Sequence, residues 1–295
     1  IFFDFNCIAD TRKKTYDIIL QLGYTSSSIW GFLLPRKKSI VTTNMDGLEW
    51  KRTKFSKPVQ SFLKFAEKLG VKFSDYLISD SVGIQAHIKN TYQKESIYIP
   101  YGSHIFLNPE KNVLEKYKIT PYEYQMLVAR LEPENSIEVI LDGVVHSTSS
   151  KPFLVIGNHQ SKFGEYLKIK YKNNKNIQFL GGIYDINVLN NLRYFSTLYF
   201  HGHTVGGTNP SLLEAMGSSA LICAHNNIFN KSILGEDAFY FNDYRDVSEC
   251  ILQIKKEDKV DSLKKNLEKI KNLYSWEVII EQYLSHFKDI YNKKN

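Results

Sequence analysis

Short apolar runs alternate with amphipathic stretches along most of the chain. The runs form two series, separated by a segment at 101–112 in which Gly, Pro and Asn lie close together. The runs predict strands at 16–22, 38–43, 75–80 and 96–100 in the first series, and at 124–129, 152–157, 177–182, 197–202, 220–224 and 238–241 in the second. Each gap in the second series is long enough for one helix. Strict alternation of strand and helix predicts two α/β units with parallel sheets.

Helical spacing of apolar residues is clearest in three stretches. Between the second and third strands, a stripe of Val59, Phe62, Leu63, Ala66 and Leu69 lies opposite Lys57, Lys64, Lys68 and Lys72. The chain ends in two further stripes, one of Val260, Leu263, Leu267 and Ile270, the other of Ile279, Ile280, Tyr283, Leu284 and Phe287. The first residues, "IFFDFN", have no Met and begin as if within a strand, so we expect residues to be missing upstream.

The run "HGHTVGGTNPSLLEAMG" at 201–217 combines a glycine turn with signals for the start of a helix. Asn209 is a good N-cap and Pro210 suits the first helical position, so a helix is expected from Pro210 to about Met216, ended by Gly217. The amides just before this helix would point, with the positive end of its dipole, toward a bound anion.

Glu214 lies about one turn inside the same helix, where a carboxylate could accept hydrogen bonds from paired sugar hydroxyls. A solvated helix residue is the alternative. Arg130 directly follows a predicted strand, and ligands of parallel sheets bind beyond the carboxyl ends of the strands. An anionic ligand is therefore expected near Arg130, unless the side chain pairs with Glu132 or Glu134.

Composition adds limits to this picture. The 295 residues are enough for two domains, and no apolar run approaches the ~20 residues of a membrane-spanning helix. The three cysteines, far apart in the sequence, indicate reduced thiols in a cytoplasmic protein. The net charge of +7 comes from scattered Lys without a nucleic-acid-binding motif, so it favours an anionic small ligand or an anionic membrane surface over nucleic acid.

Four motifs in order resemble those of the retaining glycosyltransferases of family four, which have the GT-B fold. They are "VTTNMDGLEWKRTKF" at 41–55, "IPYGSH" at 99–104, "VARLEPENSIEVILDG" at 128–143 and the run at 201–217. The first of these is similar to the branch of bacterial rhamnosyltransferase-like enzymes that build capsule or other surface polysaccharides.

The resemblance implies an α/β fold of two Rossmann-like parallel-sheet lobes that face a cleft. Residues 1–103 would form an acceptor-side lobe whose start is missing, and 104–274 a lobe that binds the nucleotide sugar. Residues 275–295 would form a helix that packs back toward the first lobe. Family members open with a strand and a glycine-rich loop, and nothing in residues 1–40 matches that pattern.

For the donor, the resemblance implies that Glu214 binds the ribose and Arg130 the diphosphate. The turn before the helix would bind the donor sugar and phosphates, and Gly181 to Tyr184 would pass along the nucleobase. The donor-binding residues are thus expected to be Gly206, Gly207, Thr208, Asn209, Glu214, Gly181, Tyr184 and Asn135. No metal or cofactor is expected, because the Arg and the helix N-terminus supply the positive charge.

Two of these positions depart from the wider family. Gly206 stands where the first of two Glu is usual, and Asn135 stands where a Lys is usual. Together the two departures leave less fixed positive charge and polar contact around the diphosphate. A protonated His201 or His203 is the expected substitute, and His203 is the preferred candidate of the two. The alternative for each is a histidine that packs at a strand end.

In the first lobe, Asp46 is expected to be a polar contact or a catalytic helper at a strand end. Glu49 and Arg52 are candidates for the acceptor side, although the two could instead pair with each other locally. The Lys residues on the helix that follows are either a solvated face or a contact to an anionic membrane.

The predicted function is transfer of a hexose, rhamnose or another deoxysugar, from a nucleotide-diphosphate sugar to a lipid-linked or growing glycan. The enzyme would be cytoplasmic, with a peripheral contact to the inner face of the plasma membrane. One alternative is a nucleotide-sugar epimerase of the same fold, and another is a non-catalytic remnant that binds nucleotide sugars.

Overall fold

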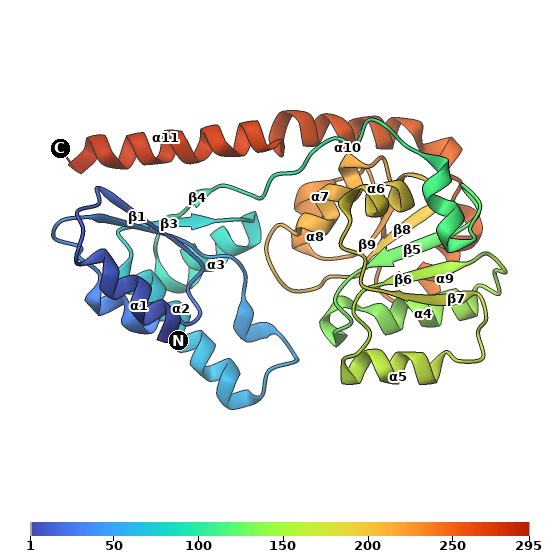
Figure 1. The fold of residues 1–295 in the computed structure, drawn as a ribbon, viewed down its shortest axis with the longest axis horizontal. Coiled ribbons are helices and arrows are strands. Elements are labelled where there is room, and N and C mark those ends of the chain that lie inside the picture. Colours follow the sequence, from blue (N-terminus) through green and yellow to red (C-terminus); the bar gives the residue numbers. More distant parts are fainter. Residues whose placement is uncertain (1, 295) are drawn as a thin grey trace. The chain divides into compact units, whose positions relative to one another are not determined.

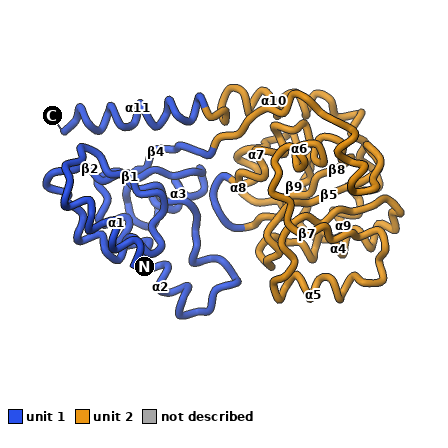
Figure 2. Tube along the Cα trace, viewed as in Figure 1, with its two compact units in different colours: residues 1–101, 205–208, 277–295 blue, residues 102–204, 209–276 orange. Residues whose placement is uncertain are grey.

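The computed structural model describes residues 2–294 and contains two parallel sheets, each flanked by helices (Figure 1). The chain divides into two compact units (Figure 2). Unit 1 comprises residues 1–101, 205–208 and 277–295, and unit 2 comprises 102–204 and 209–276. Every strand predicted from the sequence is present, with ends that differ by a few residues.

The sheet of unit 1 has four strands within the described residues, in the order β1-β2-β3-β4. They are β1 (Ile18–Leu22), β2 (Ile40–Asn44), β3 (Tyr76–Ser79) and β4 (Ile97–Tyr98). The helices of this unit are α1 (Phe2–Thr11), α2 (Lys57–Phe73), α3 (Val82–Tyr92) and α11 (Trp276–Lys294), with short 3-10 helices η1 (Ser28–Leu33) and η2 (Glu49–Lys51). Helix α11 begins at Trp276, the last residue of unit 2, and otherwise belongs to unit 1.

Alternate residues of β1 and β2 face opposite layers of unit 1. Ile19 and Val41 pack against Ile8 of α1, while Leu20 packs on the other face against Ile279 of α11. On that second face, Thr42 is hydrogen-bonded to His286 over 2.9 Å. The period-2 pattern of a strand therefore places α1 and α11 on opposite faces of the sheet.

The start of the chain corrects one expectation. Within the run that looked like part of a strand, the described residues 2–6 lie in α1. In this helix Ile8 is buried, and Asp4 accepts a hydrogen bond from Ser26 Oγ over 2.6 Å. A short apolar run cannot by itself distinguish a strand from a helix, because both periods fit it.

The apolar stripe of α2 is only partly a core face. Leu63 and Ala66 are buried as expected, but Val59 and Phe62 each keep 39% of their surface exposed. Phe65, which lies outside the predicted stripe, is 55% exposed. Unit 1 therefore carries an apolar patch on α2 beside its lysines.

The sheet of unit 2 has six strands within the described residues, in the order β10-β9-β8-β5-β6-β7. They are β5 (Gln125–Val128), β6 (Phe153–Ile156), β7 (Ile177–Gly181), β8 (Leu198–His201), β9 (Ile222–His225) and β10 (Phe239–Phe241). In chain order this is the doubly wound arrangement, and β5 and β8 are the neighbours between which the winding reverses.

Helices cover both faces of this sheet (Figure 1). They are α4 (Ile137–His146), α5 (Lys162–Lys170), α6 (Ile186–Tyr194), α7 (Pro210–Gly217), α8 (Ile228–Leu234), α9 (Tyr244–Gln253) and α10 (Val260–Leu273), with 3-10 helices η3 (Lys111–Tyr117), η4 (Pro133–Asn135) and η5 (Lys256–Lys259). One core cluster joins α4, α5 and α9 to the strands, and within it the Sγ atoms of the free cysteines Cys223 and Cys250 lie 3.5 Å apart.

Between residues 2 and 294, none of the helices combines the length and the hydrophobicity that crossing a bilayer requires.

Candidate functional site

The reversal of winding in unit 2 brings two sequence-predicted segments to neighbouring strand ends. Arg130 lies two residues beyond the end of β5, and His201 is the last residue of the adjacent β8. Ligands of doubly wound sheets bind outside the carboxyl ends of the strands at this reversal. The topology therefore supports a ligand site at this edge of unit 2.

Arg130 is exposed, and no ion pair joins it to Glu132 or Glu134 among the residues that the structure describes. Its main-chain carbonyl accepts a hydrogen bond from the side-chain amide of Asn135 over 2.7 Å. The local salt bridge that was the alternative for Arg130 is thus not formed, and the guanidinium is accessible to an anionic ligand.

Asn135 is buried, with 3% of its surface exposed, and its amide holds the turn after β5. At the position where the family that the sequence resembles carries a Lys, this chain has an amide that supports the main chain beside Arg130. Its predicted contact to the donor remains a prediction.

Helix α7 begins as the sequence predicts. The side chain of Asn209 accepts a hydrogen bond from the amide of Ser211 over 2.9 Å, and Pro210 occupies the first helical position. One turn further on, Glu214 keeps about a third of its side-chain surface exposed, at 33%.

Glu214 has a partner that the sequence did not indicate. Its Oε2 accepts a hydrogen bond from Nη2 of Arg193 over 2.7 Å, and Arg193, in the last turn of α6, is fully buried. In the sequence, this arginine differs from its neighbours only in being the one charged residue of the α6 segment, and that does not reveal a partner. Glu214 is therefore held at the surface of unit 2 by a buried cation.

His201 does not supply positive charge. It is buried, and burial, then His203, then Arg193 hold its pKa well below the ordinary value, so the ring is neutral at pH 7. Its ring stacks on that of His203 with 4.4 Å between centroids. The prediction that His201 replaces the missing charge is wrong, and it packs at the strand end instead, while His203 is half-buried and stays a candidate.

The residues expected along the nucleobase begin with Gly181, the last residue of β7, and continue to Tyr184. Gly181 has a φ of +78°, a conformation that favours glycine, and Tyr184 is 88% exposed. A broad aromatic side chain in this position offers a surface for stacking.

In unit 1, two acidic residues follow neighbouring strands. Asp46 lies after β2, and burial followed by the charge of Glu49 raises its pKa to about 6. Asp80 lies directly after β3, is 3% exposed, and has its pKa raised to about 8 by burial and then by Asp46. Only Asp46 was predicted from the sequence, although Asp80 has the same local feature, an Asp at the end of a buried strand.

The segment 205–208, which belongs to unit 1, lies against Asp80. The hydroxyl of Thr208 donates to the main-chain carbonyl of Asp80, and a Cβ on Gly207 would overlap the Asp80 carboxylate. Gly206 has a φ of +133°, which side-chain-bearing residues rarely adopt. The positive φ therefore accounts for the glycine at 206, where the family that the sequence resembles has its first Glu, and the overlap with Asp80 accounts for the glycine at 207.

The acceptor-side candidates Glu49 and Arg52 form the local pair that was their alternative. Arg52 Nε donates to Glu49 Oε1 over 2.7 Å, and both side chains are largely covered. The segment around Glu49 and Arg52 is held to α2 by Glu67. This buried carboxylate accepts hydrogen bonds from Trp50 Nε1 over 2.8 Å and from Tyr92 Oη over 2.7 Å. These hydrogen bonds, together with one to His87, hold the pKa of Glu67 below its usual value against the opposing effect of burial.

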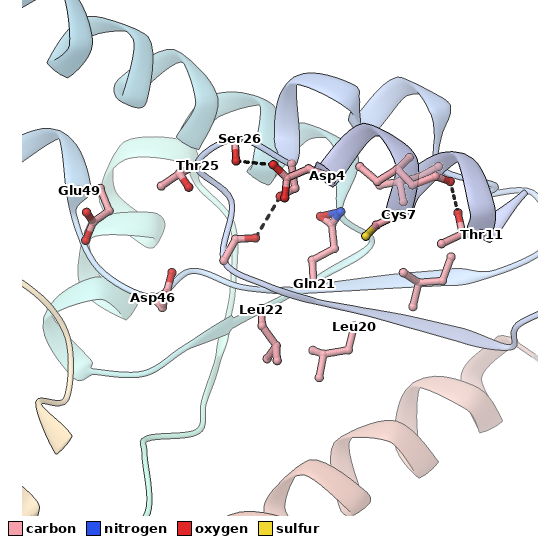
Figure 3. A pocket seen from close by; sticks show the side chains of 15 residues that line it. Asp4, Cys7, Thr11, Leu20, Gln21, Leu22, Thr25, Ser26, Asp46 and Glu49 are labelled. Atoms are coloured by element: carbon pink, nitrogen blue, oxygen red, sulfur yellow. Dashed lines mark hydrogen bonds between the residues drawn. The ribbon is translucent and has the colours of Figure 1, made fainter. Parts of the chain in front are cut away.

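A pocket of about 460 Å³ lies in unit 1 between α1 and the end of β1. Figure 3 shows Asp46 and Glu49 at one end of the pocket and Gln21 and Cys7 toward the other. Its polar lining, with three carboxylates once Asp4 is included, suits a ligand rich in hydroxyl groups. Within residues 2–294, no group of three or more His, Cys, Asp or Glu is placed to hold a metal ion.

Comparison with known proteins gives the fold a name. Residues 27–104 match a family described as a domain of unknown function, DUF1972. No curated protein matches the sequence. Among solved structures, sucrose-phosphate synthase from Thermosynechococcus elongatus is similar with a TM-score of 0.82 and 16% identity, over 99% of this chain and 78% of that chain.

Two further structures agree with this result. Anabaena HepE in complex with UDP-glucose has a TM-score of 0.80 and 14% identity, over 97% of this chain and 82% of that chain. A glycosyltransferase from Rickettsia africae has a TM-score of 0.76 and 16% identity, over 97% and 80% of the two chains. The predicted fold class is confirmed: the chain has two parallel-sheet α/β lobes like these GT-B glycosyltransferases, and the first lobe is the smaller.

Proposed function

We propose that this protein is a glycosyltransferase that moves a hexosyl group, rhamnose or another deoxysugar, from a nucleotide-diphosphate sugar to a lipid-linked or growing glycan. The observation that carries the proposal is the pair Arg130 and Glu214 in unit 2, the first after β5 at the strand-order reversal and the second on α7, the helix that follows the neighbouring strand β8. The structure of HepE with UDP-glucose supports a nucleotide-sugar ligand for this fold.

In this proposal the diphosphate of the donor binds Arg130, which forms no ion pair with an acidic side chain within residues 2–294. Glu214 accepts hydrogen bonds from the ribose, and the nucleobase lies along Gly181 to Tyr184. The donor sugar and phosphates are bound by the remaining predicted residues, which are Gly206, Gly207 and Thr208, through their amides, and the cap residue Asn209.

The reaction breaks the bond between the anomeric carbon and the phosphate oxygen and forms a bond from that carbon to an acceptor hydroxyl oxygen. The hydroxyl proton leaves with the diphosphate or a nearby base. Arg130, the N-terminus of α7 and His203 stabilise the departing negative charge, so that neither a metal nor a cofactor is needed. The configuration at the anomeric carbon is retained, in line with the family that the sequence resembles.

On the acceptor side, Asp46 contacts the reacting sugars from the carboxyl end of β2. Its raised pKa keeps a carboxylate that accepts a proton readily near neutral pH. The pocket beside it, with Glu49 and its partner Arg52, takes a hydroxyl-rich acceptor.

A lipid-linked acceptor requires an approach to the membrane, and α2 carries a surface suited to it. Val59, Phe62 and Phe65 are exposed, and Lys57, Lys64, Lys68 and Lys72 stand on the same exposed helix. Aromatic side chains beside lysines favour the headgroup region of an anionic bilayer. We infer a peripheral contact to the inner face of the plasma membrane through this surface.

Transfer from a panel of nucleotide sugars tests the proposal and separates it from its alternatives. A glycosyltransferase releases nucleoside diphosphate and forms a glycoside or, with water, free sugar. An epimerase instead returns a different nucleotide sugar, and a non-catalytic remnant binds donors without turnover. Release of diphosphate that persists in the presence of a chelator supports the metal-independent form of the proposal. Binding without any turnover contradicts transferase activity.

Glu214→Ala tests the donor site directly. The variant is expected to bind nucleoside diphosphates about tenfold or more weakly, because a charged hydrogen-bond acceptor is lost. Glu165→Ala, on the exposed face of α5 in the same unit, is the matched control and should bind as the unmodified protein does. Unchanged affinity in Glu214→Ala excludes the ribose contact.

A further inference from the structure

Arg193 is a fully buried cation beneath the donor-binding edge of unit 2, and no sequence motif marked it. Its Nη1 donates to Asn190 Oδ1 over 3.0 Å. Its Nη2 donates to Ser211 Oγ over 3.2 Å and to Glu214 Oε2 over 2.7 Å. The ring of Tyr199 lies 5.9 Å from the guanidinium carbon. The partners on α6 and α7 therefore hold the arginine from two sides.

A buried guanidinium requires a negative partner, because an unpaired charge inside a protein is strongly destabilising. Glu214 is the carboxylate that pairs with it. The Glu214 side chain is 33% exposed, whereas that of Arg193 is 1% exposed. Of the two carboxylate oxygens, Oε2 points to the arginine. The pair thus joins a buried positive charge to a partly exposed acceptor.

This arrangement limits the freedom of the Glu214 side chain. A glutamate on an exposed helix face samples several rotamers, and ordering it on ligand binding lowers affinity. The bond to Arg193 fixes the side chain before any ligand arrives. Ser211, which accepts from Arg193 and lies within 2.9 Å of Tyr199 Oη, in turn fixes the arginine.

We propose that Arg193 is a positioning residue for nucleoside recognition: it holds the carboxylate of Glu214 in the one orientation that accepts the ribose hydroxyls of the donor. The inference rests on the proposed function, because it takes the ribose contact of Glu214 as given. Arg193 itself does not touch the ligand, since its side chain is covered by protein. The ligand class is a nucleoside diphosphate whose sugar carries adjacent hydroxyls.

A purely structural ion pair between α6 and α7 makes a different prediction from a positioning pair. Loss of a structural pair lowers the melting temperature and weakens binding of all nucleotides equally. Loss of a positioning pair specifically reduces the preference for ribose over dideoxyribose. The ratio of the two dissociation constants is therefore the decisive measurement.

The experiment measures dissociation constants of UDP, ADP and GDP and of their dideoxyribose analogues by calorimetry. The unmodified protein is expected to prefer the ribose form of its best nucleotide by about tenfold or more. Glu214→Gln and Arg193→Met should each reduce this preference several-fold, and the double variant should lose no more than the greater single loss. Glu165→Ala serves again as the control on the same unit.

Circular dichroism and melting curves establish that each variant is folded. If Arg193→Met does not fold, Arg193→Lys takes its place, because the single nitrogen of an ammonium group cannot occupy the positions of both Nη1 and Nη2. Its ribose preference should fall between those of the unmodified protein and Glu214→Gln.

The outcomes separate the two proposals. A folded Arg193 variant with an unchanged ribose preference, beside a Glu214→Gln variant that has lost it, overturns the inference alone. An unmodified protein that binds none of the three nucleotides overturns the proposed function and the inference with it.

Discussion

The carboxylates Asp46 and Asp80 stand after neighbouring strands of unit 1, and both have raised pKa values. For Asp46 the value of about 6 lies just below neutral pH, so the group is ionised under physiological conditions but accepts a proton easily. For Asp80 the value of about 8 means that the carboxyl group is mostly protonated at pH 7. The two residues therefore differ in charge state although their positions are similar.

Asp46 predicts a pH dependence of the transfer rate. If the ionised carboxylate takes part, the rate rises with pH between 5 and 7, through the pKa of about 6. Asp46→Asn should lower the rate on the order of 100-fold and abolish this rise. Initial rates of donor turnover at saturating donor between pH 5 and 8 measure both effects. An Asn variant that keeps the rising profile would exclude Asp46 as its source.

Asp80 predicts a pH dependence of stability. Between pH 4 and 8 the unfolded chain releases the proton of this carboxyl group while the folded chain keeps it, so the free energy of unfolding falls as pH rises. The slope is at most about 1.4 kcal/mol per pH unit for one group. Asp80→Asn removes this contribution, so its stability relative to the unmodified protein should increase from pH 5 to pH 8.

Urea denaturation at several pH values measures that difference. Asp258→Asn, at an exposed position, is the control and should follow the unmodified protein. A constant difference between Asp80→Asn and the unmodified protein over this range would contradict a raised pKa of Asp80.

At the scale of single elements, helix α7 is the best-specified part of the site. Its cap, its proline and its bounds all follow from a few adjacent residues, which is why the sequence predicted it closely. The predicted apolar stripe on α2 is buried at Leu63 and Ala66 but 39% exposed at Val59 and Phe62. A stripe shows which residues are apolar, but not over what length the rest of the protein covers them.

The cap of α7 predicts a measurable contribution to stability. Asn209→Ala removes the hydrogen bond to the amide of Ser211 and should lower the free energy of unfolding by about 1 kcal/mol. Asn209→Asp keeps an acceptor and should change stability by only a few tenths of that amount. Urea denaturation at pH 7 compares the two, and equal losses in both would show that the cap bond does not contribute.

The exposed surface of α2 predicts binding to anionic vesicles. Sedimentation with vesicles of phosphatidylglycerol and phosphatidylcholine should retain the unmodified protein, and binding should weaken with added salt. Replacing Phe62 and Phe65 together by Ser should reduce binding several-fold. Leu252→Ser, an exposed apolar residue of α9, is the control. Equal binding of all three proteins would exclude this surface as the contact.

At the scale of the whole molecule, the proposed ligand belongs to unit 2 through Arg130 and Glu214. A nucleoside diphosphate at about 100 times its dissociation constant should raise the free energy of unfolding by about 2.7 kcal/mol. Hydrogen exchange should slow at the ends of β5 and β8 and at the start of α7. Arg130→Ala should lose most of this effect at the same nucleotide concentration. Exchange that slows only outside unit 2 would contradict the assignment of the donor site.

The sequence by itself determined the type and order of nearly all elements, the parallel character of both sheets and the cap of α7. These features depend on local spacing: alternating or helical apolar periods, and cap residues next to the helices that they begin. Arg130, Glu214 and Asp46 were singled out as site candidates in the same way, because each lies in a short motif or directly after a predicted strand.

Only the tertiary structure decided which of these residues have partners. Arg193 reaches Glu214 from a helix 21 positions away, Asp80 meets the segment 205–208, and His201 loses its charge through burial. Such pairings and charge states depend on two quantities: the order of the strands in the sheet, and the loss of solvent exposure of each side chain when helices cover the sheet. Neither quantity is contained in the spacing of neighbouring residues, because both arise when distant parts of the chain pack together.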